Sequence, residues 1–126
     1  MNSPALRRLP GALALALGLV LFAACTRLRR LPEGTSAPDM YAELECADCH
    51  GPRGEGTEKG PPLRDLRENW IYELNLAEYL RDPVPFQQGD PRVRWLWGQY
   101  SWDMPAYIHL THEQRMSFAA WLFILE

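Results

Sequence analysis

The sequence lacks several features that define common protein classes. It has no internal repeat and no low-complexity tract, which excludes a repeat array. Its uncharged apolar run, Gly11 to Ala24, falls short of the roughly 20 residues that a membrane-spanning helix needs. Positive charge does not dominate either, because the formal net charge is −3. Phosphate binding requires clustered lysine and arginine, so nucleic acid is not an expected partner.

Cysteine is also scarce, and the three cysteines are an odd number. Arg7 and Arg8, the apolar run and the small residues before Cys25 are together typical of an export signal. The segment Leu21-Phe22-Ala23-Ala24-Cys25 resembles a bacterial lipobox. We therefore predict a signal peptide over residues 1–24, cleaved before Cys25, and lipidation of that cysteine. An uncleaved anchor and ordinary secretion are the alternatives.

The remaining length permits one domain, because most domains contain roughly 100 to 150 residues. Residues 25–36 hold a proline, a glycine and a serine and little apolar periodicity, so we predict a flexible tether there. The single domain then covers residues 37–126. Arg27, Arg29 and Arg30 lie where anionic lipid headgroups would attract them. We expect the chain to be exported and lipid-anchored on the periplasmic or extracytoplasmic face of a bacterial membrane.

Helix signals occur at three places in this domain. Ser36-Ala37-Pro38-Asp39 combines a capping hydroxyl with an early proline and predicts a helix that ends near Cys49 and His50. A second helix is expected over residues 69–81, where Ile71, Leu74 and Ala77 are apolar, and Asp82-Pro83 is expected to stop it. The last helix begins after Thr111, and a glutamine three residues later completes the pattern of a capping box.

Irregular chain is expected between these helices. Four glycines and three prolines from Gly51 to Leu66 predict a specifically shaped loop. Residues 84–103 are expected to be irregular as well, and they are rich in aromatic side chains. The sequence thus predicts a small all-α domain of three to four short helices with long loops. A domain of this size needs an internal staple to be stable.

The segment Cys46-Ala47-Asp48-Cys49-His50 supplies a candidate for that staple. It matches C-x-x-C-H, the attachment signature of c-type haem. Two thiols three residues apart lie on one side of a helical turn, where both can form thioethers with the vinyl groups of one porphyrin. The adjacent histidine then points at the iron. We predict one covalent haem c, attached through Cys46 and Cys49 and ligated by His50.

Two other interpretations of this segment compete with haem attachment. A disulfide or thioredoxin-like redox pair would call for a βαβ pattern around the cysteines, and none is visible. A zinc site could instead combine Cys46 and Cys49 with His109 and His112, in a zinc-stapled interaction module.

The match extends beyond the five residues, and the sequence resembles the class I cytochrome c family over residues 37–126. Cys49-His50-Gly51 through Gly60-Pro61-Pro62-Leu63 looks like the loop that follows the haem site in that family. The resemblance implies that the Pro61 carbonyl accepts a hydrogen bond from His50, which would fix the ring's tautomer. It also implies that Leu63 packs on the porphyrin, within a set of short helices wrapped around it.

Asp103-Met104-Pro105-Ala106-Tyr107 looks like the family's methionine-ligand segment. The resemblance therefore implies that Met104 is the second axial ligand of the iron, with a thioether that raises the reduction potential. His109 is the rival ligand, and a core-filling role for Met104 is the structural alternative. Both faces of the iron would then be closed, so we expect an electron carrier and no enzymatic activity.

The remaining predictions concern aromatic residues outside the haem motif. In the family the first and last helices cross, which would bring Tyr41 against Trp121. The aromatic stretch from Phe86 to Trp102 matches no family pattern, and either Tyr100 or Trp102 is a candidate partner for a haem propionate.

The expected function is single-electron transfer in a respiratory or other redox chain. A haem-based sensor or peroxidase-like enzyme, in which Met104 is displaced, is the alternative that keeps the haem. Redox proteins or the subunits of a redox complex are the expected partners. Acidic residues beside the haem motif suggest a basic docking surface on at least one partner, although such a run is also typical of a solvated face. These residues are Asp39, Glu43, Glu45 and Asp48.

Overall fold

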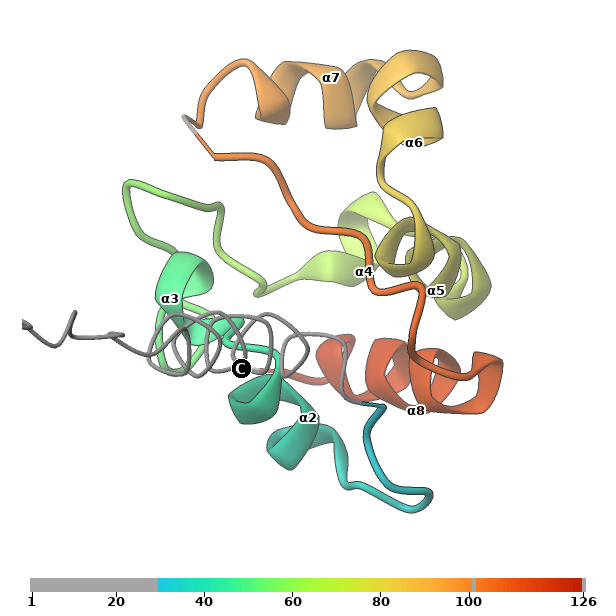
Figure 1. The fold of residues 1–126 in the computed structure, drawn as a ribbon. Coiled ribbons are helices and arrows are strands. Elements are labelled where there is room, and N and C mark those ends of the chain that lie inside the picture. The colour runs from blue at the N-terminus through green and yellow to red at the C-terminus, as the bar shows by residue number, and fades with distance from the viewer. Residues whose placement is uncertain (1–29, 101, 126) are drawn as a thin grey trace, which may run out of the picture.

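The computed structural model describes residues 30–100 and 102–125. These residues form helices and no strand, as predicted for an all-α domain (Figure 1). The helices in chain order are α2 (Ala37–Glu43), α3 (Ala47–His50), α4 (Leu66–Asn69), α5 (Glu73–Arg81), α6 (Val84–Gly89), α7 (Pro91–Trp97) and α8 (His112–Leu122). The predicted signal peptide, the predicted lipidation site Cys25 and the arginines at 27 and 29 lie outside the described residues.

The first predicted helix is divided in two. Ser36 caps α2 as expected, because its hydroxyl accepts a hydrogen bond from the Asp39 backbone N–H at 3.3 Å. The chain then leaves the helix at Leu44, and Glu45 adopts a left-handed φ of 57°. The cysteine pair therefore lies on a separate short turn, α3 with its N-cap Cys46, which is joined to α2 by the bond from the Cys46 N–H to the Tyr41 carbonyl at 3.1 Å.

The core is built where α8 packs against α5 and α2. Thr111 and Gln114 form the predicted capping box, with backbone and side-chain bonds of 3.1 and 3.0 Å. From α8, Phe118 and Leu122 are buried against residues of α5 such as Leu80. Burial of a large apolar side chain contributes roughly 1.5–3 kcal/mol, so the contact between α8 and α5 stabilises the domain.

The second predicted helix is shorter than expected. The sequence predicts a helix over residues 69–81, but α5 begins only at Glu73, and Asn69 instead ends the short helix α4. The predicted stop at Asp82 is correct, since Asp82 is the C-cap. The long loop from Gly51 is confirmed up to Asp65.

The prediction of irregular chain over residues 84–103 is wrong, because α6 and α7 occupy most of it. Prolines at the first turns and the Asp90 side chain, which accepts from the Arg92 N–H at 2.9 Å, start these helices. Helices α6 and α7 are short and largely exposed, so their apolar residues do not recur at the spacing that predicts a helix from sequence. Phe86 joins α6 to the core by packing against the rings of Trp70 and Tyr79.

The described chain begins beside α8. The Gln114 side chain donates to the carbonyls of Leu31 and Pro32 at 3.2 and 3.1 Å, and Leu31 packs against the core. The described end of the predicted tether, residues 30–36, thus lies along the domain. Figure 1 shows this segment at the opposite end of the molecule from α6 and α7. Among the described residues, none of the helices has the length and apolar character needed to cross a bilayer.

Candidate haem site

Helix α3 brings the attachment residues together. The backbone N–H of His50 donates to the Cys46 carbonyl at 2.9 Å, which closes one helical turn over the pair of cysteines. Cys46 is buried, Cys49 is half-buried, and both are free thiols. One turn therefore presents two thiols and one imidazole, which is the donor set that covalent haem requires.

The His50 ring is held by the loop that follows it. Its Nδ1–H donates to the Pro61 carbonyl oxygen at 2.7 Å, the contact that the family resemblance implied. Burial lowers the pKa of His50, and the Pro61 hydrogen bond opposes this effect. The ring is thus kept neutral, and because Nδ1 is occupied, Nε2 is the nitrogen left for a metal.

The loop from Gly51 is pressed closely onto α3. The Thr57 hydroxyl donates to the Cys49 carbonyl at 2.6 Å, and its backbone N–H donates to the Gly60 carbonyl at 2.9 Å. A Cβ at Gly60 would lie only 3.0 Å from the Cys49 carbonyl oxygen. Glycine at this position therefore allows the loop to approach closely enough for Pro61 to reach His50. Leu63, the predicted porphyrin contact, is half-buried and packs against the core.

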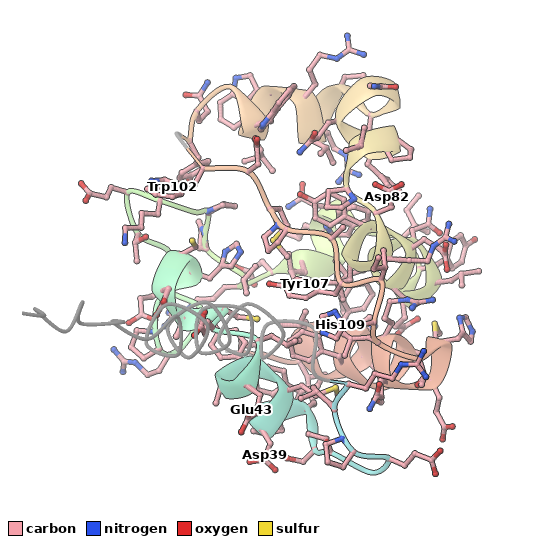
Figure 2. The ribbon with its side chains drawn as sticks, viewed as in Figure 1. Asp39, Glu43, Asp82, Trp102, Tyr107 and His109 are labelled. Atoms are coloured by element: carbon pink, nitrogen blue, oxygen red, sulfur yellow. The ribbon has the colours of Figure 1, made fainter. Side chains whose placement is uncertain are left out.

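Tyr107 is a site residue to which the sequence analysis assigned no role. It is buried, and its backbone N–H donates to the Leu80 carbonyl of α5 at 2.9 Å. Its side chain lies beside the Cys46 thiol, whose pKa burial raises to about 11. Its place three residues after Met104 was the available signal, but only the fold brings it to the cysteine. Figure 2 shows Tyr107 in the middle of the domain, near His109.

Met104 lies on a segment that is fixed at both ends. The Trp97 indole N–H donates to the Asp103 carboxylate on one side, and Tyr107 is bonded to α5 on the other. Met104 itself is half-buried and packs against the core. The rival ligand, His109, is half-buried beside Tyr107, with ring centroids 6.1 Å apart.

Tyr41 connects α2 to both the site and α8. Its hydroxyl donates to the Gly51 carbonyl at 2.6 Å, directly after His50. Its ring meets Trp121 edge-on with centroids 5.7 Å apart, the contact expected between the first and last helices. Burial raises the pKa of Tyr41 to about 12, so this hydroxyl remains a donor at physiological pH.

The alternative zinc set is not assembled. Within the described part of the chain, no group of three or more histidine, cysteine, aspartate or glutamate side chains could hold a metal ion. His112 is exposed at the start of α8. The acidic residues Asp39 and Glu43 are also exposed, and Figure 2 shows them on the α2 side, far from Trp102.

The donor set fits haem c. The two thiols can each form a thioether, the neutral His50 ring offers one nitrogen, and Met104 offers a thioether sulfur. The comparison with known families agrees, because the Cytochrome c family model matches residues 37–123. The chain belongs to the cytochrome c family, and its cofactor is a covalent haem c. No curated protein and no solved structure matches the chain.

Proposed function

We propose that this chain is a single-electron carrier whose haem iron is ligated by His50 and Met104. The observation that carries the proposal is the buried His50 ring, held by Pro61 directly beside two free thiols. Haem c supplies an iron centre that gains and loses one electron. The buried Cys46 and His50, held by the loop after them, would keep this centre dry and limit its rearrangement, which is what fast electron transfer requires.

The ligand pair distinguishes a carrier from an enzyme. The Pro61 bond makes His50 a stronger electron donor toward iron, while the thioether of Met104 favours the ferrous state. Two protein ligands would leave no position for oxygen, peroxide or carbon monoxide. The fixed ends of the Met104 segment support a ligand that is not readily displaced. We therefore propose that the chain has no enzymatic activity of its own.

The test compares two half-buried methionines, both of which pack against the core. In the holoprotein, Met104→Ala should abolish the optical band of methionine-ligated ferric haem and allow rapid binding of carbon monoxide at neutral pH. Met116→Ala, on α8, should change neither property. A wild-type protein that already binds carbon monoxide rapidly would favour the sensor or peroxidase alternative. Loss of all haem on acid-acetone extraction would refute covalent attachment.

We also propose that residues 1–24 are removed and that lipid on Cys25 tethers the domain to the extracytoplasmic face of a bacterial membrane. The lipobox-like segment supports this proposal. Metabolic labelling with a fatty acid should mark the wild-type chain and leave Cys25→Ser unlabelled. Labelling of the serine variant, or recovery of the wild-type chain with its first residues intact, would contradict it.

The partners proposed are redox proteins or subunits of a respiratory or other redox complex. The exposed acidic residues Asp39, Glu43, Glu45 and Asp48 support docking by charge with at least one of them. Electron-transfer rates should then fall as ionic strength increases, because salt screens exposed charges beyond about 8–10 Å.

A further inference from the structure

Gln114 holds the described start of the chain onto α8. Its side-chain amide donates to the Leu31 carbonyl at 3.2 Å and to the Pro32 carbonyl at 3.1 Å. We call these two hydrogen bonds the Gln114 clasp. Gln114 is only 7% exposed, and Leu31 packs against the core. A buried amide that loses its partners is costly, so the clasp should stay closed in the folded domain.

The chain after the clasp is fixed as well. The Pro32 carbonyl also accepts from the Thr35 hydroxyl at 2.7 Å and from the Thr35 N–H at 3.3 Å, which closes a turn. Ser36 then caps α2, and α2 packs against α8. Residues 31–36 are thus bound to the domain, although the sequence predicts a flexible tether there. The connection between Cys25 and the clasp is therefore residues 26–30.

This shortening decides how far the domain can move from a membrane attachment at Cys25. A chain spans at most roughly 3.6 Å per residue, so the clasp lies within roughly 20 Å of Cys25. If residues 31–36 were released, the reach to the start of α2 would be roughly 40 Å. A compact domain of this size is roughly 30 Å across. The clasped chain is therefore too short for the far end of the domain to turn toward the bilayer, and the released chain is long enough.

The clasp also determines which end faces the bilayer. Residues 31–36 and the first turns of α2 and α8 meet through the bonds of Ser36 and Gln114, and we call this region the tether end. Figure 1 shows residues 31–36 at the opposite end of the molecule from α6 and α7. A membrane at the tether end would leave α6 and α7 pointing away from it.

Charge does not account for this orientation. Arg27, Arg29 and Arg30 precede the clasp and would attract anionic lipid. Exposed carboxylates on the same side of the molecule oppose them, and Figure 2 shows two of these on α2. They are Glu33, Asp39, Glu43 and Glu113. Because the two signs nearly cancel, the length of free chain is what sets the orientation.

We propose that the tether end is the surface of this domain that faces the phospholipid bilayer, held there by the Gln114 clasp. This inference rests on the proposed membrane tether at Cys25. A basic partner that docks on Asp39 and Glu43 would then have to lie at the membrane as well. The expected partner is thus a membrane-bound redox protein, reached by lateral diffusion.

Three variants separate the clasp from the capping box, in which Gln114 also takes part. Gln114→Glu keeps the oxygen that accepts from the Thr111 N–H and removes the donors of the clasp. Gln114→Met removes both without adding a charge. Thr111→Ala weakens the capping box and keeps the donors of the clasp. All three should retain the optical spectrum of the wild-type haem.

The measurement uses the lipidated holoprotein in vesicles of phosphatidylcholine and phosphatidylglycerol. A nitroxide label is placed on His112→Cys, in the first turn of α8, or on Gln88→Cys, on α6; both positions are exposed. In the holoprotein the introduced thiol is the one available for labelling, because the other cysteines carry haem or lipid. A nickel-chelating lipid enhances the relaxation of a nitroxide that lies close to the bilayer.

With the wild-type clasp, nickel should enhance relaxation at position 112 and not at position 88. Both Gln114 variants should lose this difference, because the released domain can turn over. Thr111→Ala should keep the difference. High salt should also leave it unchanged, since chain length rather than charge sets the orientation.

Several results would overturn the proposal. Equal nickel effects at the two positions in the otherwise wild-type protein would show that the domain turns freely. Equal behaviour of Thr111→Ala and Gln114→Met would assign the effect to the start of α8 rather than to the clasp. Loss of the difference in high salt would assign the orientation to lipid charge. A chain that is recovered from cells without lipid and does not bind the vesicles would instead refute the membrane tether itself.

Discussion

Gly60 offers a direct test of how the loop controls the haem site. A Cβ at this position would lie 3.0 Å from the Cys49 carbonyl oxygen and 3.2 Å from the Cys49 carbonyl carbon and Cβ. None of these atoms is the end of a flexible side chain, so the loop must move away from α3. Overpacking of this kind costs about 1–3 kcal/mol. In a domain of this size, each kcal/mol lowers Tm by roughly 4–8 °C.

The same displacement should appear in the reduction potential. Gly60 precedes Pro61, whose carbonyl accepts the 2.7 Å hydrogen bond from His50. That bond strengthens electron donation from the ring and stabilises ferric iron. A loss of about 0.5 kcal/mol from it would raise the potential by about 20 mV for one electron. Gly60→Ala should therefore be less stable and have a higher potential than wild type.

Guanidinium denaturation followed at the main haem absorption band measures the loss of stability. A spectroscopic redox titration measures the rise in reduction potential. Gly89→Ala is the matched control, because a Cβ at Gly89 meets no atom within 4 Å and alanine suits a helix better than glycine. The control should be neutral or slightly stabilising. If Gly60→Ala matched it in both stability and potential, close packing of the loop on α3 would not position His50.

Three further predictions concern the rest of the domain. Tyr41→Phe should lower the free energy of unfolding by about 1–3 kcal/mol, because the Gly51 carbonyl loses a buried donor; denaturant midpoints measure this. Thr111→Ala should cost about 1 kcal/mol through loss of the capping box, and an unchanged midpoint would argue that the helix start is held by packing alone. In the apoprotein, iodoacetamide should modify Cys49 before Cys46, as read by peptide mass spectrometry. Cys46 is buried, and with a pKa of about 11 its thiolate is on the order of a hundredfold rarer than usual at pH 8. The raised pKa favours the protonated thiol in the folded state, so this contribution to apoprotein stability should be lost as pH rises from about 9 through 11. Equal rates of modification at Cys46 and Cys49 would contradict the burial of Cys46.

The features that depend on local chemistry could be predicted from the sequence. The spacing of Cys46, Cys49 and His50 fixes their arrangement within one turn. The capping pairs at Ser36 and Thr111 act over three residues, and both are present in the structure. The Pro61 contact with His50 spans eleven positions, and it was anticipated only through resemblance to a family.

Tertiary structure alone decided the rest. The first helix is interrupted at Glu45, which adopts a left-handed backbone conformation although it is not a glycine. Helices α6 and α7 bury too little surface for their apolar residues to recur at helical spacing in the sequence. Tyr107 reaches Cys46 because the segment after Met104 is bonded to α5, far away in the sequence. The exposure of Trp95 and Trp102 was equally unpredictable, since aromatic residues in a sequence suggest burial. Whether a side chain is buried or exposed depends on which distant segments cover it, and that information is not contained in its own neighbours along the chain.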